Sequence, residues 1–150
     1  MFKVMFFLWR REGMSRDEFR QYYEERHAHH NQRVRPASAD YRRNYPLRDD
    51  PWTDAEGLAK LGDFDVVTEN WYPARANFEK VLDVMIRTDA AKSVIEDELR
   101  FEQRDRKTVV VIDETPTLDY SSPDYEAAAR ANEEGGFKLM RFVRLVDDAD

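Results

Sequence analysis

The sequence predicts an α+β domain with the β-α-β-β-α-β order of a ferredoxin-like fold: an antiparallel sheet with helices on one face, plus a C-terminal helix and strand. Three observations predict it. Residues 2–9 read as a strand that is apolar on both faces, residues 15–27 as a capped amphipathic helix, and residues 108–112 as a β-branched run. At 150 residues the chain has the size of a single domain, and we expect a core over about residues 1–114 with an extension over about 115–150.

The first strand is followed by a helix with a strong start signal. Ser15-Arg-Asp-Glu18 is a capping-box pattern, in which the Ser15 hydroxyl accepts from the Glu18 N–H and the Glu18 carboxylate accepts from the Ser15 N–H. Phe19, Tyr23 and His27 follow at spacings of four, so they share one helix face, and that face should be buried. We expect this helix to end near His27.

The middle of the chain alternates extended and turn-rich segments. Residues 33–47 form a polar extended stretch, and residues 48–62 form a surface excursion with one short helix at 54–61. Residues 64–72 are rich in β-forming side chains, and Pro73 closes this strand.

The second half supplies the remaining helices and strands. Helical spacing begins after Ala74, and a further helix begins near Asp89, an N-cap residue type. The run at 108–112 is typical of a strand covered on both sides. Residues 125–133 and 137–146 predict a last helix and strand. Because helices cover one face of such a sheet, we expect the other face to pack on a sheet from an identical subunit.

Composition excludes several classes of function. The net charge of -7 argues against nucleic-acid binding, which needs a clustered basic surface. The chain has no cysteine, which excludes disulfides and thiol chemistry. Its apolar N-terminal run is too short to span a bilayer. We therefore expect a soluble cytoplasmic protein without a membrane partner.

The three histidines of the chain, His27, His29 and His30, lie within four residues. A buried imidazole is suited to general acid/base chemistry because its usual pKa of about 6.5 lies near neutrality. The alternative is that a histidine at a helix C-terminus only complements the helix dipole. Glu24 and His27 have the Glu-x-x-His spacing of di-iron bundles, but the second such pair is missing, so we expect no metal site.

Four segments together resemble the EthD-like families of the dimeric α+β barrel superfamily. They are Lys3-Val-Met-Phe-Phe-Leu-Trp-Arg10, Gly13-Met-Ser-Arg-Asp-Glu-Phe-Arg20, Tyr23-Glu-Glu-Arg-His-Ala28 and Asp97-Glu-Leu-Arg-Phe101. The sequence departs from the family at His29-His30, where members commonly have Pro-Leu, and in its excursion and tail. The resemblance implies a homodimeric barrel whose clefts hold small apolar or aromatic molecules, with the helix-end histidine reaching the cleft.

Relatives of this kind include decarboxylases, dehydratases, cyclases, isomerases, cofactor-free oxygenases and haem-binding branches. Our leading hypothesis is a cofactor-independent enzyme that acts on an aromatic or polyketide-like molecule through acid/base chemistry. The alternatives are a non-catalytic metabolite-binding or accessory protein and a haem-binding protein. The candidate catalytic residues are His27, Tyr23, Tyr41 and Asn44, and the candidate substrate-binding residues are Trp9, Trp71 and His30. Whether His27 or His30 faces the cavity stays open.

Overall fold

The structure is a computed structural model that describes residues 2–34 and 38–112. Its strands are β1 (Phe2–Leu8), β2 (Asp40–Asn44), β3 (Val66–Tyr72) and β4 (Thr108–Ile112). Its helical elements are α1 (Arg16–Tyr22), the π-helical turn η1 (Tyr23–His27), α2 (Ala28–Val34), α3 (Ala55–Lys60), α4 (Arg75–Arg87) and α5 (Asp89–Glu98). The chain divides into two units, residues 1–114 and 115–150. The helix and strand predicted at 125–133 and 137–146 lie outside the described residues.

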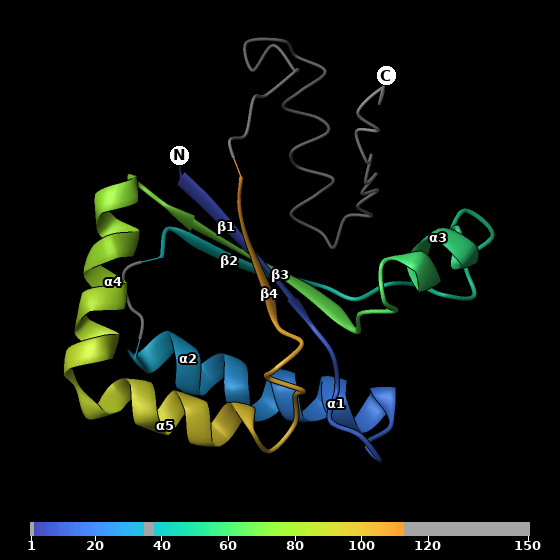
Figure 1. Ribbon diagram of the computed structural model, residues 1–150, viewed down its shortest axis with the longest axis horizontal. Helices are drawn as coiled ribbons and strands as arrows, with labels where there is room; N and C mark the ends of the chain where they lie inside the picture. The colour runs from blue at the N-terminus through green and yellow to red at the C-terminus, as the bar shows by residue number, and fades with distance from the viewer. Residues whose placement is uncertain (1, 35–37, 113–150) are drawn as a thin grey trace, which may run out of the picture. The chain divides into compact units, whose positions relative to one another are not determined.

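The four strands form one antiparallel sheet in the order β2-β3-β1-β4 (Figure 1). Leu8 pairs with Val66 across β1 and β3, and Lys3 pairs with Ile112 across β1 and β4. The two middle strands are thus the first and third in the chain, and the edges are β2 and β4. This is the predicted ferredoxin-like α+β class.

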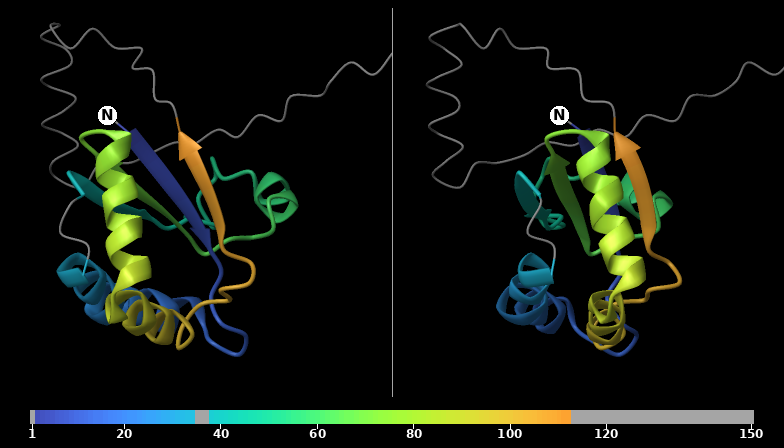
Figure 2. Two further views of the ribbon diagram at one scale, coloured as in Figure 1. Left: turned by 60° about the vertical axis from the view of Figure 1, so that its left-hand side comes forward. Right: turned by 90° about the vertical axis from the view of Figure 1, so that its left-hand side faces the viewer.

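The helices pack on one face of the sheet through two apolar clusters. The first joins Leu8 and Val66 of the sheet to Phe19 and Tyr23. The second cluster joins Val4 and Tyr72 to Val81, Met85 and Val94 of α4 and α5. Figures 1 and 2 show α2 and α5 lying side by side. Because side chains alternate along a strand, the helix-facing positions of β1 and β3 are their even-numbered residues.

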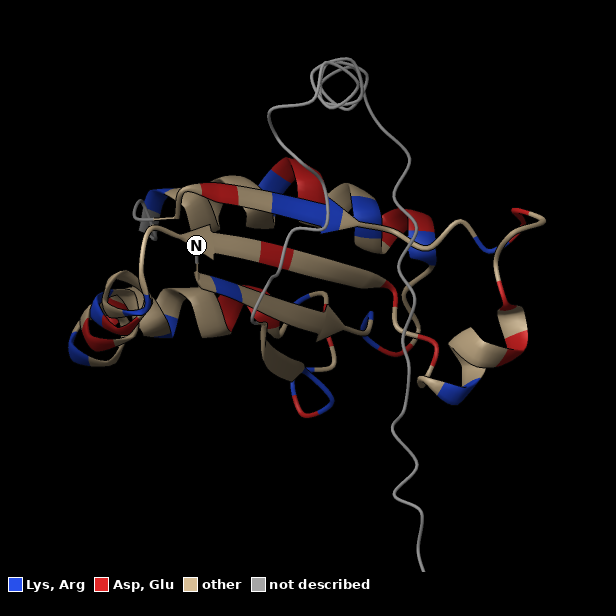
Figure 3. Ribbon diagram, turned by 90° about the horizontal axis from the view of Figure 1, so that it is seen from above, with Lys and Arg blue, Asp and Glu red and all other residues tan. Residues whose placement is uncertain are grey.

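The opposite face of the sheet is also largely buried. Met5, Val67, Glu69 and Trp71 lie on this face and are each at most 8% exposed. Figure 3 shows that basic and acidic residues are interspersed along the helices, whereas β1 and β3 carry few of either. The prediction that a second subunit covers this face stays a prediction.

Three expectations about the elements are wrong. The helix does not end at His27, because η1 and α2 continue it to Val34, through residues that include neither Gly nor Pro. The valine run is not covered on both sides: β4 is an edge strand, and Val109 and Val111 are 51% and 54% exposed. Helix α5 begins at Asp89 as expected, but the side chain that caps it is that of Thr88, not of Asp89.

Candidate functional site

The candidate site is built on the helix that the capping box starts. The Glu18 N–H donates to Ser15 Oγ at 3.2 Å, and the Ser15 N–H donates to Glu18 Oε2 at 2.8 Å, as predicted. The Ser15 hydroxyl also donates to Glu18 Oε2 at 2.7 Å, and the bonds from the Ser15 N–H and hydroxyl hold the pKa of the Glu18 carboxyl below its usual value. This fixed start orients the helix so that Phe19 faces the sheet and is 1% exposed.

A π-helical turn follows at the predicted site residues. The Ala28 N–H donates to the Tyr23 carbonyl oxygen, a five-residue step in place of the four-residue step of an α-helix. The rings of Tyr23 and His27 meet edge to face, with centroids 4.9 Å apart. Tyr23 and His27 are 2% and 3% exposed, so their spacing correctly predicts a shared buried face. Because the helix continues past His27, the explanation of this histidine as a complement to a helix terminus does not apply.

The His27 imidazole is held by a carboxylate from α5. Its Nδ1 lies 2.7 Å from Asp97 Oδ2, and the Tyr22 hydroxyl donates to Asp97 Oδ1 at 2.8 Å. A carboxylate accepts hydrogen bonds, so this contact favours the tautomer in which Nδ1 carries the proton. The Nε2 lone pair of His27 is then the position at which a proton can be taken up.

Burial governs the basicity of this imidazole. Removal from water lowers the pKa of His27 below its usual value, while the hydrogen bond and the charge of Asp97 act in the opposite direction. The ring also contacts Phe101 with centroids 4.8 Å apart, and Tyr22 stacks on Phe101 at 5.2 Å. His27 is thus neutral near neutral pH and lies in an aromatic environment, a state suited to a general base.

A phenol pair lies next to the imidazole. The hydroxyl oxygens of Tyr23 and Tyr41 are 2.7 Å apart and share a hydrogen bond between η1 and β2. Burial, followed by the neighbouring Tyr41, raises the pKa of Tyr23 well above its usual value. Tyr23 therefore remains a protonated phenol and a hydrogen-bond donor.

Ion pairing fixes the strand that carries Tyr41. The Arg43 guanidinium donates to Glu24 Oε2 at 2.8 Å, and the Tyr45 hydroxyl donates to Glu24 Oε1 at 2.7 Å. Arg43 also lies over the Tyr41 ring, 4.9 Å from its centroid. These contacts join β2 to η1 and restrict the position of the Tyr41 ring.

Two buried polar side chains lie on elements next to those that carry these rings. Asn70 lies on the helix-facing side of β3, directly across from Tyr41, and is 5% exposed. Asn31 lies on α2, and its Oδ1 is buried without a hydrogen-bond partner among the described residues. Buried polar groups are normally satisfied by protein, water or ligand, so Asn31 offers an acceptor to a bound molecule.

The structure brings together only some of the predicted site residues. Asn44 donates from its Nδ2 to Glu69 Oε1 at 2.8 Å, on the face of the sheet opposite His27. Trp71 shares that opposite face, where Lys3 lies 4.6 Å from its ring centroid. Trp9 packs against Gly62 and Arg106, and His30 contacts Ser93 Oγ at 3.2 Å. The structure thus brings His27, Tyr23 and Tyr41 together and places Asn44 and the two tryptophans elsewhere.

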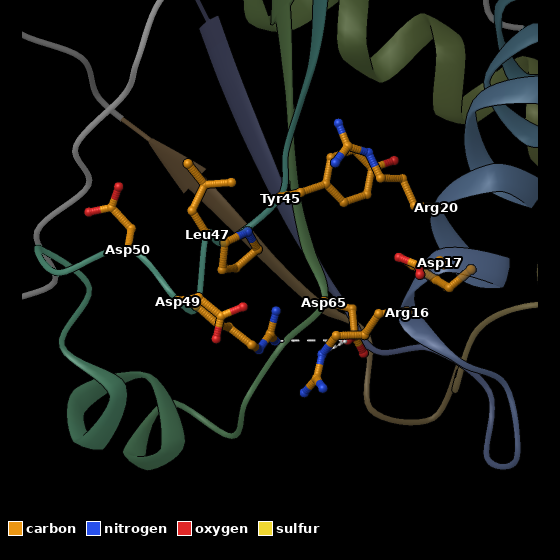
Figure 4. A pocket seen from close by; sticks show the side chains of 11 residues that line it. Arg16, Asp17, Arg20, Tyr45, Leu47, Asp49, Asp50 and Asp65 are labelled. Atoms are coloured by element: carbon orange, nitrogen blue, oxygen red, sulfur yellow. Dashed lines mark ion pairs between the residues drawn. The ribbon is translucent and has the colours of Figure 1, made fainter.

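Two surface hollows lie elsewhere. One, of about 630 Å³, lies between α1 and the segment after β2, where Arg16 and Arg48 pair with Asp65 (Figure 4). The other, of about 590 Å³, lies over the outer face of the helix at His29. Neither of these hollows is lined by His27, Tyr23 or Tyr41. The Arg16 and Arg48 guanidinium groups of the first hollow pair with both Asp63 and Asp65.

Within residues 2–34 and 38–112, three or more side chains of the kinds that ligate metals do not gather at any point. None of the helices in this part of the chain is both long and apolar enough to cross a membrane.

Comparison with known proteins assigns the chain to a family. The EthD domain profile matches residues 11–105. An ethyl tert-butyl ether D family protein from Bacillus halodurans C-125 shares the fold with a TM-score of 0.53 at 17% identity, over 77% of this chain and 100% of that one. A protein of Arabidopsis thaliana matches with a TM-score of 0.53 at 8% identity, over 79% of this chain and 99% of that one. A search of curated proteins finds no match. The profile match spans most of the chain and includes His27, Tyr41 and Asp97, so the chain belongs to the EthD domain family.

Proposed function

We propose that this protein is a cofactor-independent enzyme that moves a proton on a small aromatic or polyketide-like molecule, with His27 as general base and acid. One observation carries the proposal: the buried His27 imidazole is oriented through Nδ1 by Asp97 at 2.7 Å. An imidazole held in one tautomer by a carboxylate is the arrangement in which Nε2 accepts a proton efficiently. Family membership supports a small molecule as the ligand.

The neighbouring groups suit the charges of such a reaction. When Nε2 removes a proton from an acidic carbon or hydroxyl of the substrate, the imidazole becomes a cation, and Asp97 stabilises it. The substrate oxygen becomes an enolate or phenolate, which a hydrogen bond from the Tyr23 and Tyr41 hydroxyl pair would stabilise. Return of the proton from Nε2 to another carbon completes an isomerisation. Its return to a hydroxyl oxygen that leaves as water, as the C–O bond breaks, completes a lyase step. Its return to a carbonyl oxygen whose carbon has been attacked by the enolate carbon completes a cyclisation.

The test is solvent deuterium exchange, which needs no knowledge of the net reaction. A panel of aromatic 1,3-dicarbonyl compounds is incubated with protein in D₂O, and loss of the acidic C–H signal is followed by NMR. We compare wild type with His27→Gln, and with His29→Gln as the control, since His29 is exposed on the same helix. The expected result is exchange by wild type and the control, and a loss of about 10²–10⁴-fold in His27→Gln. Equal exchange by His27→Gln would refute the proposal.

The burial of His27 favours a second candidate, a non-catalytic metabolite-binding protein. With 3% of the residue exposed, a ligand reaches Nε2 only after some movement of its surroundings. A binding protein would perturb the NMR signals of panel compounds and return them with their protons unexchanged. Haem binding, the third hypothesis, predicts a visible absorption band in the freshly purified protein.

We also propose that the protein works as a homodimer in the cytoplasm. Support for the dimer comes from edge strand β4, where Val109, Val110 and Val111 are 36–54% exposed, more than an apolar run usually is in a monomer. The absence of cysteine supports a reducing compartment.

A further inference from the structure

A second buried ionisable group, Glu102, lies beyond the end of α5 and has no role in the steps above. Its side chain is 1% exposed, and its Oε1 lies 3.0 Å from Lys107 Nζ. Its Oε2 is buried and has no hydrogen-bond partner among the described residues. Its backbone forms a bridge with Arg10, which fixes its position next to the end of β1. An ionised carboxylate with one unsatisfied buried oxygen is costly, so this group needs an explanation.

The neighbouring charges do not satisfy Glu102. Lys107 lies closer to Glu98, at 2.6 Å from its Oε1, and Arg104 donates to Glu98 Oε2 at 2.7 Å. The Arg10 guanidinium is 2.6 Å from Asp65. Glu98 therefore receives two cations, whereas Glu102 shares one of them.

These surroundings change the acidity of Glu102. Burial raises the pKa of Glu102 to about 7, repulsion from Glu98 adds to this effect, and Lys107 opposes it. The carboxyl group thus exchanges a proton in the range where His27, whose pKa is lowered by burial, is already neutral. In many active sites the acid and the base are two groups whose pKa values the protein shifts in opposite directions, as it does for Glu102 and His27.

Glu102, Glu98 and Lys107 act electrostatically on the Tyr23 phenol and the His27 imidazole. The charge of Glu102 contributes to the raised pKa of Tyr23, and the charges of Glu98 and Lys107 act on the pKa of His27. Lys107 Nζ also lies 5.9 Å from the ring centroid of Phe6, which packs against the cluster that contains Tyr23. The three charged residues Glu102, Glu98 and Lys107 therefore border the same part of the core as the site.

We infer that Glu102 is a second proton-exchanging group of this site, holding a proton on Oε2 and setting the charge felt by the Tyr23 hydroxyl. Uptake of one proton converts its carboxylate to a neutral carboxyl group, while the Lys107 ammonium keeps its contact with Glu98. The neutral form donates a hydrogen bond and the ionised form accepts one. The inference rests on the proposed function only for its role in turnover, because proton exchange at Glu102 is a property of the free protein.

The pH dependence of Glu102 reflects every charged group that faces it. Within the described residues, Glu98 from α5 and Arg104 and Lys107 from the segment before β4 act on its pKa, and its charge acts on Tyr23 of η1. The Arg10 guanidinium is paired with Asp65. Among these groups, Lys107 forms the hydrogen bond to the carboxyl group. Removal of the Lys107 charge should therefore move the midpoint of proton uptake to higher pH.

Infrared spectroscopy of the ligand-free protein tests proton exchange. We compare wild type, Glu102→Gln and Glu96→Gln, the last being an exposed glutamate on α5 as control. The carbonyl stretch of a protonated carboxyl group should titrate with a midpoint within about one unit of pH 7 in wild type and control, and should be absent in Glu102→Gln. Absence of such a titration in wild type, or its survival in Glu102→Gln, would overturn the inference.

A second measurement tests the connection to Tyr23 without any substrate. In protein labelled with ¹³C at the tyrosine Cζ, the Tyr23 signal, assigned with Tyr23→Phe, should shift with the same midpoint as the infrared band. This shift should vanish in Glu102→Gln and should move to higher pH in Lys107→Gln. The Lys107→Gln variant still tests the coupling if Glu102→Gln does not fold. A Tyr23 signal independent of pH in wild type would overturn the coupling, even if the carboxyl group titrates.

The pH profile of deuterium exchange connects this inference to turnover. Wild type should show one limb from His27 and a second limb near pH 7 from Glu102. Glu102→Gln should lose only the second limb, whereas His27→Gln should lose exchange. If neither limb exists because no compound exchanges, the proposed function fails, while the infrared and Tyr23 titrations still decide whether Glu102 exchanges protons beside Tyr23.

Discussion

At the scale of single residues, Asp97 is the group on which the orientation of His27 depends. It accepts hydrogen bonds on both oxygens, from the Tyr22 hydroxyl at 2.8 Å and from His27 Nδ1 at 2.7 Å. Two donors from one helix thus fix a carboxylate from another, and the imidazole plane is fixed in turn. A partner of this kind holds the base in its working tautomer and stabilises the imidazolium that forms in the reaction.

Replacing Asp97 tests this dependence. In Asp97→Asn the charge and the charge-assisted hydrogen bond that favour the imidazolium are lost, so the pKa of His27 should fall further below its usual value. Deuterium exchange should fall by about 10-fold or more, because the imidazolium formed in the reaction is no longer stabilised. Long-range ¹H–¹⁵N NMR of the imidazole measures the titration. A His27 titration identical to that of wild type would show that Asp97 has no such role; Glu96→Gln serves as the control.

Glu102 should also leave a signature in the pH dependence of stability. Its pKa rises from a usual 4.5 to about 7 on folding, so the folded state binds more protons within that interval. The free energy of unfolding contributed by this group is therefore present at low pH and lost as pH rises through about 7. His27, whose folded pKa is lowered, contributes with the opposite sign: its stabilisation is lost as pH falls below its usual pKa of 6.5.

Urea unfolding of wild type and Glu102→Gln across this range separates the two contributions. The stability of Glu102→Gln relative to wild type should increase from pH 4.5 to about 7 and then level off. The total change should be on the order of 3 kcal/mol at most. A difference between the two proteins that does not vary with pH would contradict the assignment. In Glu96→Gln the difference from wild type should stay flat.

At the scale of the elements, the start of the first helix is a separable source of stability. Ser15→Ala removes the side-chain acceptor of the capping box and should destabilise the fold by about 1 kcal/mol. Urea unfolding measures the loss, with Glu12→Ala as an exposed control before the helix. An unchanged midpoint would mean that packing of Phe19 and Tyr23 alone holds this helix start.

Local patterns predicted the elements where one physical signal dominates. The capping box and the spacing of Phe19, Tyr23 and His27 gave the correct helix start and buried face. The end of that helix was wrong because the three histidines were interpreted as terminal residues, whereas nothing between His27 and Val34 breaks a helix. The β-branched run at 108–112 correctly predicted a strand. It did not predict that the strand lies at the edge of the sheet and is exposed, because an edge position depends on the order of the strands in space.

The site was only partly predictable for related reasons. Tyr23 and His27 share a helix face, so one pattern found both. Tyr41 and Asn44 are three residues apart on one strand, and side chains alternate with a period of two, so they face opposite sides of the sheet. Asp97 was missed because it meets His27 across 70 residues of sequence, a contact that no local spacing contains.

At the scale of the whole molecule, the assembly predicted from the second face of the sheet can be tested at one position. Val110 lies across from Met5 on that face and is 36% exposed. Val110→Asp places a charge there and should raise the dissociation constant of the dimer by at least about tenfold, which corresponds to about 1.4 kcal/mol. Native mass spectrometry over a concentration series measures it. Ile86→Asp, at an 81% exposed position of α4, is the control and should leave the dimer intact. A wild-type protein that is monomeric throughout would contradict the assembly.

The π-helical turn η1 makes the length of the chain in this region as important as its composition. An α-helix advances by about 100° per residue, and a π-helical turn takes up one extra residue by widening, so the helix that follows keeps its rotation. Glu25 is exposed within η1, and its replacement should be tolerated. Its deletion would restore a regular α-helix in which Asn31 follows Tyr23 by seven residues, about 700° of rotation, so both stay on one face. Related sequences should therefore be able to lose this residue without rotating α2, whereas the spacing of four residues between Tyr23 and His27 depends on it.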